Sequence, residues 1–266
     1  MNSCLHFLQE IRSNPIAVEH ALILLLAVVG PIIDWLTMPR IKRSCNSATR
    51  RRYYLAVILS EWATAGIAVW CIGETTIWSG GKAVVAGTTT LGRPLLIVPI
   101  LMLGLTFLTL ACTNFLRSIR NPSIRDSYAR AVAKSSFRFL FPTTSGEIRW
   151  FVVLSLTAGI CEEIVYRSFL INYFFAGPLH FALPLAFVFS TLLFGIAHVY
   201  QGWVGIIQTA ITGIILGLLF LATGSLLLVI VVHALVDLQV VLMLRPGWES
   251  KVEQASPKIQ LAAATD

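Results

Sequence analysis

The sequence predicts an all-α protein, a polytopic bundle of seven or eight transmembrane helices. Hydrophobic residues make up 56% of the 266 residues, and only 12% are charged, whereas soluble domains carry about 25% charged residues. Apolar stretches of about 20 residues, the length that crosses a bilayer, recur from end to end with no soluble block between them. We therefore expect one integral membrane domain over residues 1–266.

Seven of these helices can be placed from the apolar runs. The expected spans cover roughly 17–38, 53–72, 95–116, 149–175, 179–200, 203–222 and 225–244. Between the third and fourth spans, residues 122–141 mix polar and apolar side chains. This segment is either an interfacial helix on the inner membrane surface or a plain basic connector. In the sixth span, Gly213 and Gly217 are four residues apart, a spacing that allows close helix contact.

The positive charge is concentrated in two loops. Of the 20 Lys and Arg residues, six lie in 39–52 and seven in 117–149. Such loops mark the cytoplasmic side and attract anionic lipid headgroups, so the net charge of +7 indicates membrane lipids as partners and no nucleic acid. This orientation places the N-terminus outside and residues 245–266 inside as a cytoplasmic tail. The plasma membrane is the expected location.

The cysteine pattern excludes several kinds of site. The five cysteines are scattered singly, with no pair at metal-ligand spacing, so neither disulfides nor a structural zinc site are expected. Cys161 is expected to be a small apolar filler of the membrane core rather than a nucleophile. The five positions are Cys4, Cys45, Cys71, Cys112 and Cys161.

The fourth span carries charges in the middle of an otherwise uncharged run. Glu162, Glu163 and Arg167 lie between two apolar stretches, 151–160 and 168–175. Charges near the bilayer centre are costly and usually functional. On a helix, Glu163 and Arg167 are four apart and share a face, while Glu162 points about 100° away. We expect the arginine to hold Glu163 and to leave Glu162 free for chemistry.

Further polar side chains fall within other spans. His198 ends the fifth span, and His233 and Asp237 are four residues apart on one face of the seventh. At about 1.5 Å of rise per residue, Glu162 and His233 lie near mid-membrane, and His198 lies at the inner end of its span. With helix tilt, these three residues can line one cavity that opens toward the cytoplasm. Glu61, near the middle of the second span, either pairs with a basic group or lines the same cavity.

This set of groups suits peptide hydrolysis. A buried glutamate can act as general base on a water molecule, a histidine beside it can share that water, and a second histidine can stabilise the oxyanion. Alternatively, Glu162, His198 and His233 could bind a divalent metal such as zinc that activates the water. The spacing leaves both mechanisms open. The sequence contains neither His-Glu-x-x-His nor Gly-x-Ser-x-Gly, so zincin and serine hydrolase sites are not supported.

At these residues the sequence resembles the CAAX protease and bacteriocin-processing family, also called the CPBP or Abi family. The family pattern is Glu-Glu-x-x-x-Arg, then Phe-x-x-x-His, then His-x-x-x-Asn or Asp, on successive membrane helices. The matching residues run from 162 to 237, within an expected catalytic core of 149–244. They are Glu162, Glu163, Arg167, Phe194, His198, His233 and Asp237.

The resemblance implies an intramembrane endopeptidase of the glutamic type, a class formerly described as metalloproteases. By analogy, Glu162 is the general base and works with His198 on the attacking water, without a required cofactor. Glu163 and Arg167 would position the site, and His233 and Asp237 would form the oxyanion hole. Asp237 departs from the prenyl-protein proteases, which have Asn there. A carboxylate donates a hydrogen bond only when it is protonated, and otherwise must act by orienting His233. This departure weakens a specific CAAX assignment and slightly strengthens the metal alternative.

The expected substrate is a membrane-associated peptide or protein, with or without a lipid modification, cut near the cytoplasmic face. Two other classes of function remain open. One is a catalytically silent scaffold or bacteriocin-immunity-type protein, against which the intact motifs argue. The other is an ion-coupled transporter, because intramembrane Glu, Arg and His also suit proton relays. Inverted repeats would favour a transporter, and none is evident.

Overall fold

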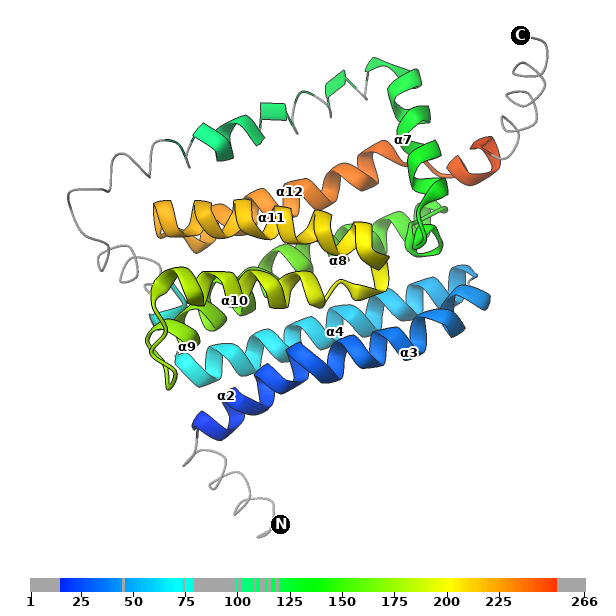
Figure 1. The fold of residues 1–266 in the computed structure, drawn as a ribbon. Coiled ribbons are helices and arrows are strands. Elements are labelled where there is room, and N and C mark those ends of the chain that lie inside the picture. Colours follow the sequence, from blue (N-terminus) through cyan, green and yellow to red (C-terminus); the bar gives the residue numbers. More distant parts are fainter. Residues whose placement is uncertain are drawn as a thin grey trace.

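The computed structural model describes residues 15–44, 46–73, 75–78 and 120–252, with shorter pieces between 99 and 117. The elements of this part of the chain are all helical, and most run side by side in a bundle (Figure 1). The all-α class is therefore confirmed for these residues. Half of the expected third span, 95–116, lies outside them, as do residues 253–266 of the expected tail. The count of seven or eight spans remains a prediction.

Two long helical segments form the N-terminal part of the bundle. The first contains a π-helical stretch, η1, between α2 and α3, and it ends in a strongly basic turn. The second is α4, which begins where the Asn46 side chain accepts a hydrogen bond from the Thr49 N–H at 2.9 Å. The bounds are α2 Pro15–Leu24, η1 Leu25–Val29, α3 Gly30–Arg43 and α4 Ser47–Ile72.

The expected fourth span is one long helix with a π-helical centre. It runs through α8 (Ser145–Glu162), η3 (Glu163–Leu170) and α9 (Ile171–Phe175). A capping box starts it: Thr144 accepts from the Glu147 N–H, and the Glu147 side chain reaches back to the Thr144 N–H. Every residue of η3 is buried. π-Helical turns are rare and frequent at functional sites, and this one begins at Glu163.

Three α-helices and a short 3-10 helix follow between residues 183 and 243. The fifth span is shorter than expected, because residues 176–182 form turns and α10 starts only at Leu183. A left-handed glycine, Gly224 with φ of 64°, ends α11, and the Ser225 side chain caps α12 by accepting from the Leu228 N–H. The bounds are α10 Leu183–Ile196, η4 Val199–Gln201, α11 Gly202–Thr223 and α12 Leu226–Met243.

Several of these helices are long and apolar enough to cross a membrane. Within the described residues, three helices meet this description by length and composition: Ile16–Arg43, Ser47–Ile72 and Val199–Thr223. Two shorter apolar helices, Leu183–Ile196 and Leu226–Val241, accompany them. These five segments correspond to the first, second, sixth, fifth and seventh expected spans. Their outer faces present large apolar side chains, of which Trp203 is the most exposed at 81%, as a surface in contact with lipid does.

The central helix is packed between two others. α8 packs chiefly against α4 and α12, and η3 contacts α4, α10 and α12. α10 packs against α11, where added side chains at Gly213 and Gly217 would meet the rings of Phe194 and Phe187 at 2.8 and 2.6 Å. The expected close contact at this pair of glycines is therefore present. The packing brings the polar residues of the fourth, fifth and seventh spans to one place.

A shorter helix crosses one end of the bundle. α7 (Pro122–Lys134) begins at Asn121, whose side chain accepts from the Ser123 N–H, and it runs at a steep angle to the long helices (Figure 1). Its apolar side packs on Leu244 and Trp248, and the Trp248 indole donates to the Pro142 carbonyl at 2.9 Å. The first residues of the expected tail are thus packed. Of the two alternatives for 122–141, the structure has a helix over 122–134.

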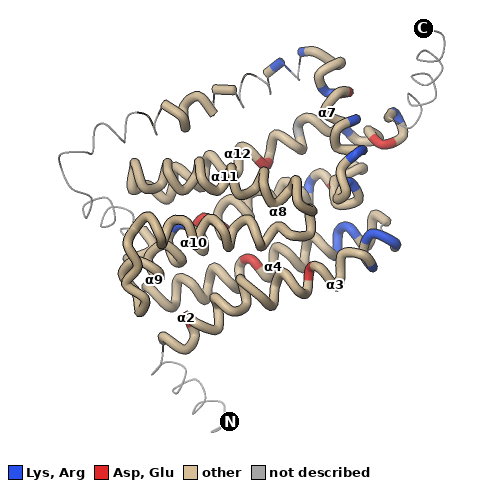
Figure 2. The backbone as a smooth tube through the Cα atoms, viewed as in Figure 1, with Lys and Arg blue, Asp and Glu red and all other residues tan. Residues whose placement is uncertain are grey.

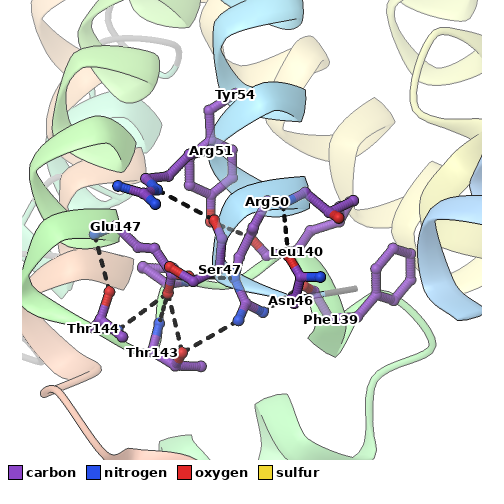
Figure 3. Close-up of polar contacts among 12 residues, drawn as sticks. Asn46, Ser47, Arg50, Arg51, Tyr54, Phe139, Leu140, Thr143, Thr144 and Glu147 are labelled. Atoms are coloured by element: carbon purple, nitrogen blue, oxygen red, sulfur yellow. Dashed lines mark hydrogen bonds and ion pairs between the residues drawn. The ribbon is translucent and has the colours of Figure 1, made fainter. Parts of the chain in front are cut away.

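A buried ion pair joins the first turns of α4 and α8. Arg50 Nε lies 3.1 Å from Glu147 Oε1, with the two side chains 8% and 0% exposed. Arg50 also donates to the Phe139 carbonyl at 2.7 Å, and Glu147 Oε2 accepts from the Thr143 N–H at 2.7 Å (Figure 3). Because burial of a charge is costly unless it is paired and hydrogen-bonded, this network fixes how α4 meets α8.

We predict that Arg50→Ala lowers stability by about 3–5 kcal/mol, the cost of leaving a buried partner charge unpaired. The measurement is thermal unfolding of the detergent-solubilised protein. The matched control is Arg52→Ala, which removes the same charge two residues away from an exposed position. Equal unfolding temperatures for the two variants would show that the buried ion pair does not stabilise the contact between α4 and α8.

Candidate active site

The predicted site residues surround one cavity inside the bundle. The cavity has a volume of about 350 Å³ and reaches from Glu162, on α8, toward the end of the bundle that α7 crosses. Its wall includes His198, His233 and Asp237, as the sequence predicted, and also Glu61 of α4. The volume lies in the range of small ligand sites, about 300–1,000 Å³. The cavity can therefore hold a short segment of a peptide.

Glu163 lies behind this wall and is bonded to two other motif residues. Its Oε2 is 3.1 Å from Arg167 Nε, one turn away on η3, and its Oε1 is 2.7 Å from His233 Nδ1 on α12. The Glu163 side chain is fully buried, and Arg167 and His233 are 3% and 6% exposed. The expected Glu163–Arg167 pair is therefore present. The bond to His233, 70 residues away, was not predicted.

Arg167 is held on its other sides as well. Its Nη2 donates to the Gly213 carbonyl of α11 at 3.3 Å, and its guanidinium carbon lies 4.3 Å from the centre of the Phe194 ring. A guanidinium at this distance over an aromatic ring gains a cation–π interaction. Arg167 thus connects η3, α10 and α11, and it fixes Glu163 from the side opposite His233.

Glu162 is separated from these contacts, although it is the neighbouring residue. Its carboxylate faces the Nε2 atoms of two imidazoles: His198 Nε2 lies 3.9 Å from Oε1, and His233 Nε2 lies 3.8 Å from Oε2. Both distances exceed a direct hydrogen bond, and both can be bridged by one water molecule. The predicted division, with Glu163 held and Glu162 free, agrees with this geometry.

Hydrogen bonds on the far side of each ring decide which nitrogen faces Glu162. His198 Nδ1 lies 2.8 Å from the Phe194 carbonyl oxygen. A carbonyl only accepts hydrogen bonds, so Nδ1 carries the proton, and Nε2 of the neutral ring presents a lone pair to the cavity. His233 Nδ1 is likewise bonded to the Glu163 carboxylate, which leaves its Nε2 toward Glu162.

Asp237 lies one turn beyond His233 on α12. Its Oδ2 is 3.8 Å from His233 Nε2, and its side chain is 35% exposed. This distance is too long for a direct hydrogen bond, so Asp237 does not orient the ring from this position, whereas Glu163 does. Asp237 instead adds a carboxylate to the cavity on the side of α7.

Aromatic residues that the sequence did not single out form much of the remaining wall. Tyr53, Tyr128, Phe137 and Tyr200 line the cavity. Burial and the nearby charge of Asp237 raise the pKa of Tyr128, on α7, to about 12, so its phenol stays neutral. The spacing of Tyr53 and Glu61, eight residues apart on α4, is the one sequence signal that could have indicated this wall. Cys161 is buried and is not part of it.

The geometry around Glu162 differs from that of a metal site. In the described part of the chain, no group of three or more His, Cys, Asp or Glu residues is arranged to hold a metal ion. The imidazole nitrogens lie 3.8 and 3.9 Å from the Glu162 oxygens. Two ligands of tetrahedral zinc, with bonds of about 2.0–2.1 Å, lie about 3.3 Å apart. For zinc to bind Glu162, His198 and His233, each imidazole would have to move about 0.5 Å closer to the carboxylate.

Basic side chains gather at the end of the bundle toward which the cavity extends. Figure 2 shows Lys and Arg concentrated where α3 ends and α4 begins, along α7, and beyond α12. The cavity itself is different, because none of the described residues that line it is Lys or Arg. A positively charged end thus surrounds an interior with three carboxyl groups.

The fold and the site together define a class: a helical membrane bundle with a carboxylate and two imidazoles around an internal cavity. Comparison with protein families gives a match to the family described as type II CAAX prenyl endopeptidase Rce1-like, over residues 144–239. This stretch contains every motif residue from Glu162 to Asp237. No curated protein and no solved structure matches the chain.

Residues 144–239 thus match the CAAX protease family, as the motif residues indicated. The match and the apolar helices support a membrane peptidase of the CAAX-protease-like type. The matched residues begin at the capping box of α8 and end within α12. The match therefore covers the helices that carry Glu162, His198 and His233, and does not include α4.

The site depends on a close approach of α8 to α12, and we predict that Gly159→Ala disrupts it. An added Cβ at Gly159 would lie 2.9 Å from the Cβ and backbone nitrogen of Ala234. Overpacking of this kind costs about 1–3 kcal/mol, and it would move Glu163, one turn further on, away from His233. Peptidase activity should fall further than the unfolding temperature does.

The matched control is Gly66→Ala in α4, where nothing lies within 4 Å of an added Cβ. This variant should keep its activity, because alanine favours a helix over glycine by about 1 kcal/mol. Equal activity of the two variants would mean that the α8–α12 contact does not position the site.

Proposed function

We propose that the protein is an intramembrane endopeptidase that hydrolyses a peptide bond by means of a water molecule activated by Glu162 and His198. The observation that supports this most strongly is the placement of Glu162, whose carboxylate faces two imidazole Nε2 atoms at 3.8 and 3.9 Å. A water between the carboxylate and His198 would donate one hydrogen bond to each. Glu162 would take the proton as that water attacks the peptide carbonyl.

His233 is proposed to stabilise the oxyanion. Because the Glu163 carboxylate accepts from Nδ1, an imidazolium at this position would donate its Nε2–H to the oxygen that becomes negative. Arg167 and Glu163 would act as positioning residues, since neither lines the cavity. Asp237, also expected in the oxyanion hole, would contribute there only when protonated.

The proton taken by Glu162 is proposed to go to the leaving amine. The C–N bond then breaks, a carboxylic acid and an amine are formed, and Glu162 is again a carboxylate. Water supplies both the hydroxyl and the proton, so this sequence needs no metal or other cofactor. The spacing around Glu162 supports this mechanism over the zinc alternative.

The substrate is proposed to be a membrane-associated protein or peptide, with or without a lipid modification. We further propose that the basic end of the bundle and the C-terminal residues face the cytoplasm, and that the protein resides in the plasma membrane. The concentration of Lys and Arg at this end (Figure 2) supports the orientation, because positive loops remain on the cytoplasmic side. The cavity would then receive substrate from the cytoplasmic face.

We predict that Glu162→Gln lowers kcat about 10²- to 10⁴-fold, the usual contribution of a general base. His198→Ala and His233→Ala should reduce hydrolysis below the detectable level. The measurement is cleavage of a fluorogenic peptide library, with prenylated C-terminal CAAX peptides included, by the purified protein. Cys161→Ala, the adjacent residue, is the matched control and should keep wild-type activity. Comparable cleavage by wild type and Glu162→Gln would overturn the proposed base.

A second prediction concerns the metal. Activity should remain complete in excess chelator, because the proposed water is activated by side chains alone. The measurement is the cleavage rate of chelator-treated protein before and after addition of zinc. Loss of activity with chelator and its recovery with zinc would support the metal alternative instead.

A further inference from the structure

Among the described residues of the cavity wall, Glu61 is the one acidic residue that lies outside the family match. It is located on α4 and lines the cavity together with Glu162 and Asp237. α4 packs directly against α8 and η3, the helical segments that carry the Glu-Glu-x-x-x-Arg motif. The proposed hydrolysis assigns no role to Glu61, although a charge at this depth of a membrane protein is costly and usually functional.

The described surroundings of Glu61 contain no partner for its charge. Its Oε2 atom is buried and makes no hydrogen bond to the described residues. The sequence left open whether Glu61 pairs with a basic group or lines the cavity, and the cavity wall is where it lies. A buried polar atom without a partner is uncommon in proteins, and it often marks a place where an ion, a water molecule or a ligand binds.

Apart from its two histidines, the described cavity wall carries only acidic charge. Three carboxyl groups line it, and none of the described residues in its wall is Lys or Arg. The arginine of the motif, Arg167, is already paired with Glu163 behind the wall. Carboxylates that share one cavity repel one another, and a cation among them removes that repulsion.

Resting on the proposed peptidase function, we infer that Glu61 binds a positively charged group of the substrate, a basic side chain near the scissile bond. The carboxylate is placed opposite the motif helix, so a cation that it holds would lie beside the peptide bond presented to Glu162. The site would therefore select basic over neutral residues at one substrate position. Glu61 would act in specificity, and Glu162 in the chemistry.

The rest of the α4 wall suits such a side chain. Tyr53, Val57 and Glu61 follow at four-residue spacing and all line the cavity. Tyr53 and Glu61 are about 12 Å apart along the helix axis at about 1.5 Å per residue. The aliphatic stem of an arginine or lysine can lie along the apolar part of this stripe while its charged head reaches the carboxylate.

The test uses pairs of fluorogenic peptides that differ only by arginine or its neutral isostere citrulline, at each position within three residues of the cleaved bond. For wild type, we expect kcat/KM to be about tenfold higher for the arginine peptide at one position, as for a buried charge-assisted hydrogen bond. In Glu61→Gln this ratio should fall to about one, mainly through the arginine peptide. Glu61→Lys should invert the preference in favour of a glutamate peptide over its glutamine equivalent.

Glu249→Gln is the matched control, because it removes the same charge from a residue outside the cavity. It should leave the arginine-to-citrulline ratio unchanged. A merely structural role of Glu61 would lower the rates for both peptides equally and leave their ratio intact. Cleavage without a charge preference, or a preference that persists in Glu61→Gln, would overturn the inference and leave the proposed function standing.

A binding measurement separates the two proposals. The labelled arginine and citrulline peptides are titrated into protein that carries Glu162→Gln, with and without Glu61→Gln, and fluorescence anisotropy is recorded. Tighter binding of the arginine peptide that requires Glu61 would support the inference even if wild type cleaves nothing, in which case the proposed hydrolysis fails. Equal binding of both peptides would contradict the inference on its own.

Discussion

The site depends on the two contacts that the buried Glu163 carboxylate makes, to Arg167 on one side and to His233 on the other. In an apolar bundle, each of these charges alone would be costly, and together they compensate one another. The pair of contacts links the motif helix to α12, and through Arg167 also to α11. Because Glu163 holds Nδ1 of His233, it decides which nitrogen of that ring is turned to the cavity.

The same constraint explains why two adjacent glutamates have different surroundings. Consecutive residues on a helix point about 100° apart, so Glu163 faces the protein interior while Glu162 faces the cavity. The π-helical turn begins between them, at Glu163, and packs against α4, α10 and α12. Catalytic groups need a rigid support, and the fully buried η3 with its arginine anchor supplies one.

The sequence predicted best those features that depend on residues close together in the chain. Composition and apolar runs predicted the helical class, and four-residue spacing predicted the Glu163–Arg167 pair. The contact between Glu163 and His233 could not be found in this way, because it depends on how α8 meets α12 at Gly159 and Ala234. The π-helical turn and the late start of α10 were missed for a similar reason, since tertiary packing overrides local pattern there.

The residues of the cavity wall were likewise predicted only in part. The depth of Glu162, His198 and His233 in the membrane predicted that they meet at one cavity, and the family resemblance added Asp237. The aromatic wall could not be predicted in this way, because Tyr128 reaches it from a helix that crosses the end of the bundle. Glu61 was predicted only in part. A lone carboxylate in a membrane span indicates a functional role, but the sequence does not show which group it contacts.

The most direct test of this account compares Glu162→Gln with Glu163→Gln in both thermal unfolding and peptide cleavage. If Glu163 stabilises the fold and Glu162 acts in the reaction, Glu162→Gln should lose activity without loss of stability. Glu163→Gln should lose about 3–5 kcal/mol, because Arg167 is then buried without its partner charge. Equal loss of stability in the two variants, or full activity of Glu162→Gln, would contradict the account.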